Sequence, residues 1–372
     1  MTIRTAVVGG GTVSEVHLTG VQRNPRTELV GVCDIEEDVA RDLADEYDTR
    51  AFFDLAEMLA AINLDWVHLC TPVQTHLDLA RTAIEAGVPV QIEKPITETY
   101  DEFEELADVA RAHGVAVSEV HNHVFDPAMR VAMARKDAGD LGEVKGVNMV
   151  YTGSSSPDDP NRGPWNFDLA GGEFEEGLPH PLYLLLRAGG YPRDAGSIQA
   201  TSSLFGVYDR PFDYDGAQVG YVTDDDVLCS ATVLGGTIPN RVLLVHGTEA
   251  SLTVDFVSQT VEVHDRDYKA SSAARALNNL DRAGDRIAGT VANARGVFHR
   301  FRHDDWDTAR SLDGHYYQFD AEARALETGG EMPVPLEEAR WTVGLMEAVR
   351  EDARTDPERD AEAPPTLETD GE

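Results

Sequence analysis

The first third of the chain alternates short apolar runs with stretches in which apolar residues recur every three or four positions. The short runs predict buried strands, and the longer spacing predicts amphipathic helices. The predicted strands are Ile3–Val8, Leu29–Cys33, Trp66–Cys70, Pro89–Ile92 and Val115–Val120. The predicted helices are Thr12–Arg23, Asp38–Tyr47, His76–Ala86 and Tyr100–His113. This alternation indicates an α/β domain over residues 1–122, with a doubly wound parallel sheet covered by helices on both faces.

The pattern changes after about residue 140, where turns rather than helices separate the apolar runs. The predicted strands there are Val144–Tyr151, Ser197–Tyr208, Val227–Leu234, Arg241–His246 and Ser251–Phe256. They predict an open, mainly antiparallel sheet. Helices expected at Leu182–Arg187, Tyr316–Glu327 and Leu336–Arg350 complete an α+β domain over residues 123–350. Residues 351–372 are acidic and lack an apolar period, so we expect a disordered tail there.

The charge balance excludes some classes of protein. The 372 residues include 67 Asp and Glu against 31 Lys and Arg, a formal net charge of -36. Nucleic-acid binding requires a basic face, and docking on an anionic membrane requires positive charge, so neither is expected. No apolar run reaches the roughly 18–20 residues of a membrane span, and no signal sequence follows the first residue. Cys33, Cys70 and Cys229 lack metal-binding spacing, so we expect a cytoplasmic protein with reduced cysteines and no metal site.

Lysine is scarce, with only Lys94, Lys136, Lys145 and Lys269 in the chain. Many carboxylates with few lysines suit a salt-rich cytoplasm, because molar salt screens their repulsion within a few ångströms. This favours a halophilic source; a lineage preference for arginine codons is the alternative.

A glycine-rich turn follows the first predicted strand. Gly9 and Gly11 occupy the first two positions of a GxGxxG pattern, and Ser14 occupies the third. A strand, a glycine turn and a helix point backbone N–H groups and a helix N-terminus at an anion, as in Rossmann-type dinucleotide sites. Asp34 ends the next strand, where its carboxylate can accept hydrogen bonds from an adenosine ribose and repel a 2′-phosphate. No arginine follows at residues 35–40, so NAD is favoured over NADP.

Several motifs together resemble a known family. They are Gly9–His17, Thr71-Pro72 with His76, Glu93-Lys94-Pro95, and the pair Gly171-Gly172 followed by Glu176 and His180. This set is similar to the glucose–fructose oxidoreductase, inositol dehydrogenase and rhizopine catabolism (Gfo/Idh/MocA) family over about residues 3–350. The resemblance implies a nicotinamide-dependent oxidoreductase with a Rossmann domain and an open-sheet domain that presents the substrate.

The resemblance and the chemistry agree on three candidate catalytic residues. Oxidation of a carbinol needs a base for the hydroxyl proton and a cation beside the developing alkoxide. Lys94 suits the cation, and His180 suits the base because Pro179 and Pro181 place it in the first turn of a helix, where the dipole disfavours imidazolium. Glu176 stands where the family usually has Asp and would orient His180 or bind a sugar hydroxyl.

The cofactor and substrate sets follow from the same motifs. The expected cofactor-binding residues are Gly9, Gly11, Thr12, Val13, Asp34, Thr71, Pro72, His76, Glu93 and Lys94. The expected substrate residues are His121, Asn122, Arg162 and Trp165. The chain departs from the family at His123 and Val124, where arginines are frequent, at Asn166, and at Leu178, which replaces a glycine.

One segment stands apart from the acidic remainder. Residues 269–302 carry seven Lys or Arg against Asp281 and Asp285, with apolar residues at roughly helical spacing. Three interpretations remain open: a helix at the substrate domain or a subunit interface, a region that recognises a phosphate-bearing substrate, and an amphipathic helix that touches lipid.

The sequence therefore predicts an NAD-preferring enzyme that moves hydride to or from a secondary hydroxyl or ketone of a sugar, polyol or sugar nucleotide. One alternative is NAD-using glycoside hydrolysis or epimerisation, in which the cofactor is regenerated within each turnover. Another is a ligand sensor that binds the dinucleotide without turnover. A homo-oligomer, either a dimer or a tetramer, is expected through the exposed face of the second sheet.

Overall fold

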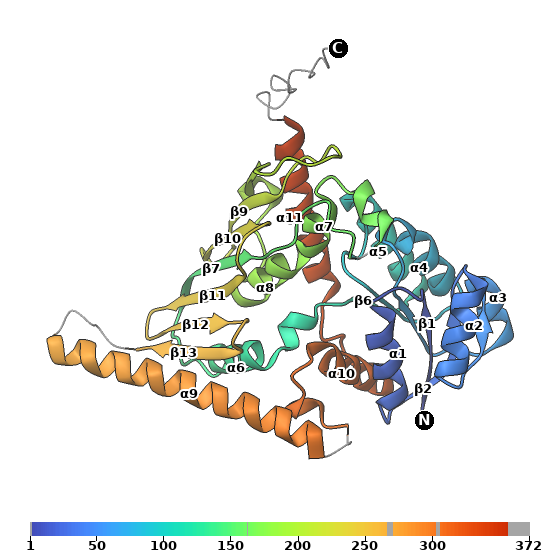
Figure 1. The fold of residues 1–372 in the computed structure, drawn as a ribbon, viewed down its shortest axis with the longest axis horizontal. Coiled ribbons are helices and arrows are strands. Elements are labelled where there is room, and N and C mark those ends of the chain that lie inside the picture. The colour runs from blue at the N-terminus through green and yellow to red at the C-terminus, as the bar shows by residue number, and fades with distance from the viewer. Residues whose placement is uncertain (1, 162, 266–270, 303–305, 356–372) are drawn as a thin grey trace, which may run out of the picture.

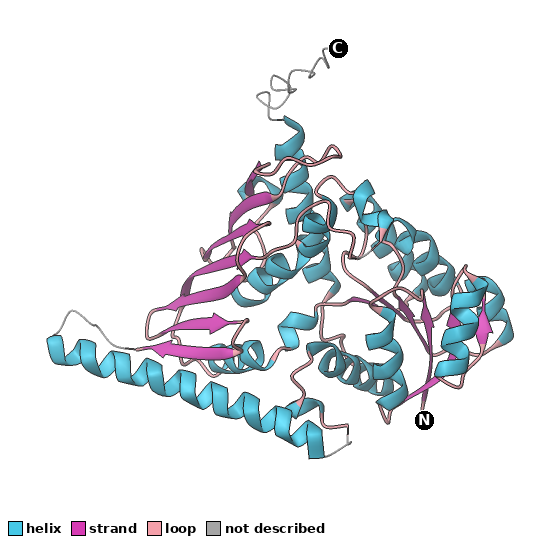
Figure 2. Cartoon of the chain, in the orientation of Figure 1, coloured by secondary structure: helices cyan, strands magenta, loops and turns pink. Residues whose placement is uncertain are grey.

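The computed structural model describes residues 2–161, 163–265, 271–302 and 306–355. Its two sheets lie on opposite sides of the molecule, with helices between and around them (Figures 1 and 2). Within the described residues, every helix is too short or too polar to cross a lipid bilayer.

The first sheet has the strand order β3-β2-β1-β4-β5-β6, and all of its pairings are parallel. Its strands are β1 (Ile3–Val8), β2 (Thr27–Cys33), β3 (Ala51–Phe52), β4 (Trp66–Leu69), β5 (Val90–Ile92) and β6 (Val117–Glu119). Its helices are α1 (Ser14–Arg23), α2 (Glu37–Glu46), α3 (Leu55–Ala61), α4 (His76–Glu85) and α5 (Tyr100–His113). The doubly wound prediction is confirmed. The prediction missed β3 and α3, which are too short to show a hydrophobic period.

The second sheet has the order β13-β12-β11-β7-β10-β9-β8, in which only β7 and β10 pair in parallel. Its strands are β7 (Val144–Thr152), β8 (Gln199–Ser203), β9 (Gly216–Val222), β10 (Leu228–Leu234), β11 (Asn240–Gly247), β12 (Ser251–Asp255) and β13 (Thr260–His264). The mainly antiparallel prediction is confirmed. The long strand predicted to end at Tyr208 was wrong, because the N–H groups of Phe205 and Gly206 bond to the Asp215 carboxylate instead of a neighbouring strand.

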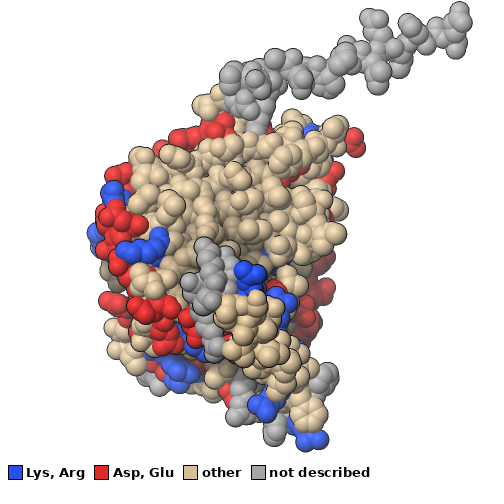
Figure 3. Space-filling model, turned by 90° about the vertical axis from the view of Figure 1, so that its left-hand side faces the viewer, with Lys and Arg blue, Asp and Glu red and all other residues tan. Residues whose placement is uncertain are grey.

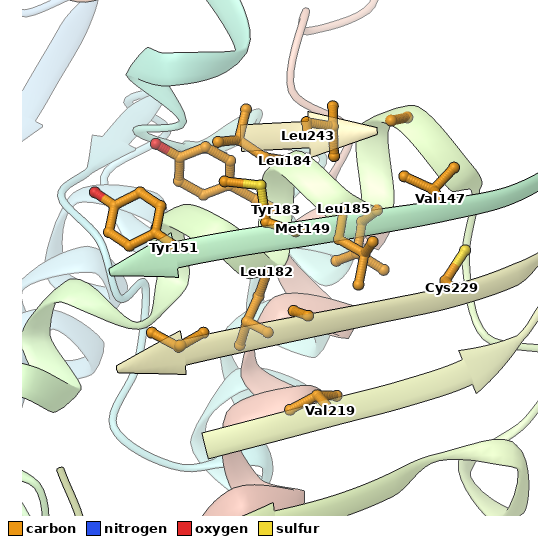
Figure 4. Packing of buried hydrophobic residues seen from close by; sticks show 14 of the residues in the cluster. Val147, Met149, Tyr151, Leu182, Tyr183, Leu184, Leu185, Val219, Cys229 and Leu243 are labelled. Atoms are coloured by element: carbon orange, nitrogen blue, oxygen red, sulfur yellow. The ribbon is translucent and has the colours of Figure 1, made fainter. Parts of the chain in front are cut away.

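Helices α6 (Pro127–Asp137), α7 (Gly172–Gly177) and α8 (Pro179–Gly189) lie on the inner side of this sheet. The apolar run predicted as a helix is α8, and Leu182, Leu184 and Leu185 are fully buried in the main core (Figure 4). Helix α8 begins at Pro179, which places His180 in its first turn as predicted. The three cysteines are free and buried, also as predicted.

Two late helices join the two halves. Helix α10 (Gly314–Thr328) packs Phe319 against Gly20 of α1, and α11 (Leu336–Thr355) contacts α5, α8 and β8. Helix α11 continues past the predicted start of the tail at residue 351, because Asp352 accepts hydrogen bonds from the backbone and hydroxyl of Ser202. Residues 356–372 lie outside the described residues.

A buried charge network fixes α11 to the end of β6 and to α8. The ring of His121 lies just after β6 and bonds through Nε2 to Glu119 at 2.7 Å and through Nδ1 to Glu338 of α11 at 2.8 Å. Arg187 of α8 donates to the same Glu338 carboxylate. Burial alone would lower the pKa of His121, but the two carboxylates outweigh it and raise the pKa to about 8.

This network predicts a stability change near neutral pH. A histidine whose pKa rises from 6.5 to about 8 on folding contributes fully below pH 6.5, and the contribution is lost as pH rises through 8. We expect the free energy of unfolding to fall by about 2 kcal/mol between pH 6 and 9. Urea unfolding of the wild type and of His121→Gln at several pH values measures this slope. Equal slopes for the two proteins would contradict the assignment, whatever the absolute stability of the variant.

Candidate active site

Two adjoining cavities, each of about 650 Å³, open at the carboxyl ends of the first sheet. The first runs along the glycine turn and the end of β2, and the second lies between the first sheet and the second. Both are lined by Thr12, Val13, Glu93, Lys94 and Glu176, so these residues lie where the cavities meet. This is the position at which open α/β sheets bind ligands.

The glycine turn is shaped by close backbone packing on one side and open space on the other. Gly9 has a φ of +96°, and a Cβ there would lie 2.6 Å from the carbonyl oxygen of Cys70. A Cβ on Gly11 would meet no atom within 4 Å, although Gly11 lines the cavity. The following helix, α1, has no side-chain cap at its N-terminus. The turn therefore leaves room and backbone dipoles for an anionic group such as a pyrophosphate.

Asp34 lies at the end of β2 with its carboxylate in the first cavity. It accepts the N–H of Gly10 at 2.7 Å through Oδ2 and that of Glu36 at 2.8 Å through Oδ1. Each oxygen keeps a further lone pair, so the fixed carboxylate can still accept from two ribose hydroxyls. The residues present thus fit a dinucleotide.

The loop after β4 forms the opposite wall. Thr71 and Pro72 line the first cavity, as the motif suggests. His76 is not on the cavity wall: it is buried, and its ring nitrogens bond to the carbonyls of Thr71 and Pro95. His76 therefore holds this loop against the turn that follows Lys94.

Lys94 and Glu176 meet across the two halves of the molecule. The Lys94 ammonium donates to the backbone carbonyl of Glu176 at 3.0 Å and forms an ion pair with its carboxylate. Both side chains are nearly buried. Glu93 beside them bonds to His17 at 2.9 Å, and despite burial this contact lowers the pKa of Glu93 to about 2. Lys94, the residue predicted to act as the cation, thus lies where the two cavities meet, with its ammonium oriented by Glu176.

His180 is held by a tyrosine that the sequence analysis overlooked. Its Nδ1 lies 2.7 Å from the hydroxyl of Tyr183, which donates to Oδ1 of Asn122 and accepts from the backbone N–H of His123. Because the one hydroxyl hydrogen goes to Asn122, Nδ1 of His180 must be the donor to Tyr183. The lone pair of a neutral ring is then on Nε2, as a general base requires.

The predicted substrate residues separate into three groups. Asn122 lines the second cavity and Trp165 lines the first. His121 faces neither cavity, because both of its ring nitrogens bond to buried carboxylates. Arg162 lies outside the described residues.

Tyr151 and Arg241 also line the second cavity, and the sequence analysis missed both. The role of Tyr183 could have been predicted, because it follows His180 by three residues on the same helix and such residues are neighbours. Tyr151 and Arg241 meet only because β7 pairs with β11. No local sequence pattern predicts this pairing. The described residues contain no group of His, Cys, Asp and Glu arranged to hold a metal ion.

Comparison with known proteins supports this interpretation of the first cavity. Residues 3–121 match the family model described as an oxidoreductase family with an NAD-binding Rossmann fold, GFO_IDH_MocA. The chain is 32% identical to D-glucoside 3-dehydrogenase of Escherichia coli over 38% of its own length and 41% of that protein. It is 30% identical to inositol 2-dehydrogenase of Rhizobium meliloti over 42% of its own length and 47% of that protein.

These alignments are partial: the first relatives are matched over less than half of their lengths. The whole fold is similar to that of the WlbA dehydrogenase of Bordetella pertussis, solved with NADH and UDP-GlcNAcA. That likeness has a TM-score of 0.72 at 20% identity and covers 95% of this chain and 96% of the other. These comparisons show that residues 3–121 are similar to the NAD-binding Rossmann fold of this oxidoreductase family.

The two glycines predict a separable pair of effects. Gly9→Ala forces a positive φ and a backbone clash, so it should destabilise the fold by about 1–3 kcal/mol. Gly11→Ala meets no protein atom, so its melting temperature should stay near the wild type while its affinity for NADH falls at least tenfold. Thermal unfolding and fluorescence titration measure the two quantities. Unimpaired NADH binding by Gly11→Ala would show that the turn does not contact the dinucleotide.

Proposed function

We propose that this protein is an NAD-preferring dehydrogenase or reductase that acts on a secondary hydroxyl or ketone of a sugar, polyol or sugar nucleotide. The observation that carries the proposal is the meeting of Lys94 and His180 on the wall of one cavity, which adjoins the glycine-turn cavity. The relatives named as dehydrogenases of a glucoside and of inositol agree with it.

The preference for NAD rests on the end of β2. The fixed carboxylate of Asp34 lies where the adenosine ribose of a dinucleotide would bind, and it would repel a 2′-phosphate. The residues that follow, Ile35 to Ala40, include three acids and no base. This loop offers no cation to a phosphate.

The protein's part in the chemistry is to hold the reacting oxygen and move its proton. When bound, nicotinamide supplies the hydride acceptor or donor. During oxidation, Nε2 of His180 accepts the hydroxyl proton, because Tyr183 fixes the other nitrogen as a donor. The Lys94 ammonium stabilises the negative charge that develops on the oxygen, and Glu176 keeps that ammonium in place. During reduction, His180 returns the proton.

A matched pair of lysine variants tests the function. The protein is titrated with NAD(H) and NADP(H), and a panel of sugars, polyols and sugar nucleotides is then screened for NADH formation. Lys94→Met should lower kcat at least a hundredfold, because it removes the cation at the reacting oxygen. Lys145→Met is the control, since Lys145 is exposed on β7 and pairs with Glu143 at the surface.

Each result has a distinct meaning. NADH formation that depends on Lys94 and not on Lys145 supports the proposal, and tighter binding of NAD than NADP supports the cofactor preference. Altered product without net NADH would indicate an internal redox cycle. Binding of NAD without any chemistry would indicate a sensor, and binding of neither cofactor would overturn the proposal.

A further inference from the structure

Arg241 lies on the wall of the second cavity and is held in an unusual way. It projects from β11 opposite Tyr151 of β7, and its guanidinium carbon lies 4.5 Å above the centre of the Tyr151 ring. Its Nε atom is buried and has no hydrogen-bond partner within the described part of the chain. A buried donor without a protein partner costs free energy, which a bound water, ion or ligand can offset.

Comparison with other arginines shows why this one is distinct. Arg81 and Arg130 also have a buried Nε without a partner, but Arg81 pairs with Glu105 and Arg130 donates to the carbonyls of Ala309 and Ser311. No hydrogen bond or ion pair joins the Arg241 guanidinium to a described residue. In a chain of net charge -36, a half-buried cation without a carboxylate partner is unexpected.

The acidic residues of the cavity are already engaged. Glu176 pairs with Lys94, and Glu173 accepts from the side-chain amide of Asn166 at 2.7 Å. Glu93 is bonded to His17. Among the described residues, no ion pair joins any of these carboxylates to Arg241.

Tyr151 connects this charge to the proposed base. The ring of Tyr151 stacks on that of His180 with an interplanar angle of 22° and a centroid distance of 6.4 Å. The same ring makes the cation–π contact with Arg241. In Figure 4 the hydroxyl groups of Tyr151 and Tyr183 point out of the apolar core in the same direction. One aromatic side chain therefore links the guanidinium to His180, so a single small molecule can contact both.

We propose that Arg241 binds an anionic group of the substrate, a carboxylate or a phosphate, while another part of the same molecule reacts at His180 and Lys94. The planar guanidinium can donate two parallel hydrogen bonds to either group. Stacking on Tyr151 orients that fork before the ligand arrives. This inference rests on the proposed function and restricts its substrates to acidic sugars or sugar phosphates.

Paired substrates test the inference. Neutral hexoses and polyols are compared with the corresponding uronic or aldonic acids and with the corresponding sugar phosphates, using the NAD-loaded protein. We expect kcat/KM to favour the anionic member of a pair by at least tenfold. The carboxylate and phosphate arms reveal which group the site takes.

Variants assign the effect to Arg241. Arg241→Gln should lower kcat/KM for the anionic compound ten- to hundredfold and change that for its neutral partner less than threefold, and Arg241→Lys should retain part of the preference. Arg50→Gln is the matched control, because Arg50 stacks on Phe52 outside both cavities. Calorimetric titration of the same compounds provides a readout without turnover.

The outcomes separate this inference from the function on which it rests. Turnover of neutral and anionic compounds alike, unaffected by Arg241→Gln, would overturn the anion site and leave the dehydrogenase intact. If no compound is turned over, the proposed function fails. Calorimetry then tests the anion site by itself. Binding of the acids that requires Arg241 supports the site, and the absence of binding overturns it.

A second, independent observation concerns α9 (Ser272–Arg302), which has its polar side turned toward the protein. Arg282 and Arg286 bind Glu262 of β13, and the Asp285 carboxylate accepts the N–H of Val263. Large apolar residues lie on the other side, with exposed fractions of 48% for Leu277, 68% for Leu280, 66% for Ile287, 42% for Val291 and 55% for Phe298. An amphipathic helix ordinarily packs the other way round.

The exposed residues follow a regular spacing. With the small residues Gly284 and Ala294 included, successive positions of the stripe are separated alternately by three and four residues. The stripe consists of Leu277, Leu280, Gly284, Ile287, Val291, Ala294 and Phe298. This is the heptad pattern by which one helix packs along another. The stripe is about 32 Å long, and Gly284 and Ala294 allow the two backbones to approach closely.

We infer that the stripe pairs with the same stripe on α9 of a second copy, antiparallel about a two-fold axis midway between Ile287 and Val291. This arrangement places Ile287 opposite Val291 and Leu280 opposite Phe298, and it brings Asp281 of one copy near Arg295 of the other. The broad face next to α9 has few charged residues (Figure 3), so little repulsion opposes a neighbouring copy there. A net charge of -36 disfavours an anionic membrane as the partner.

Mass measurement tests this pairing. Light scattering and sedimentation of the full chain at 1–50 µM should give a dimer or a larger even assembly. Leu280→Glu with Ile287→Glu should halve the mass, whereas Asn279→Glu, on the edge of the same helix, should not. All three substituted positions are exposed. Circular dichroism of each variant checks that the helix persists. A monomeric wild type, an unchanged mass of the double variant, or sedimentation with vesicles of anionic lipid would overturn the inference.

Discussion

A buried ion pair between Lys94 and Glu176 joins the two halves of the molecule at the point where the cavities meet. Removing two charges from water is costly unless the geometry is good and further hydrogen bonds are made. Here the ammonium also donates to the backbone carbonyl of Glu176, which fixes α7 against the end of β5. The position of the second cavity relative to the glycine turn thus depends on this contact.

The surrounding polar groups follow the same principle of satisfied partners. Tyr183 uses its one hydrogen and both lone pairs within the cluster of Asn122, His123 and His180. Such a saturated hydroxyl holds the histidine ring and its tautomer more firmly than one contact would. Arg241 differs from Tyr183, because its guanidinium makes no hydrogen bond or ion pair with a described residue and its Nε is buried. Tyr183, whose hydrogen-bonding capacity is filled, holds the cavity in shape. Arg241, whose capacity is not filled, is the residue that we propose binds the ligand.

The sequence revealed what depends on local patterns. Buried parallel strands, the glycine turn, Asp34 at the end of β2, and His180 in the first turn of α8 each leave a signal within a few residues. The position of His121 could not be predicted, because its carboxylate partners Glu119 and Glu338 are brought together only by packing of α11. The same holds for Arg241, whose place on the cavity wall is set by the register of β11 against β7. The apolar stripe of α9 was visible in the sequence, but its outward direction depends on Glu262 of β13.

The late helices have a consequence for synthesis on the ribosome. Trp66 and Ile3 of the first sheet pack against Phe319 and Ala323 of α10, more than 240 residues further along the chain. Nascent chains that end before α10 therefore expose a tryptophan that the finished protein buries completely. The first sheet therefore completes these apolar contacts only after α10 has been synthesised, and a chain that ends earlier leaves this surface uncovered.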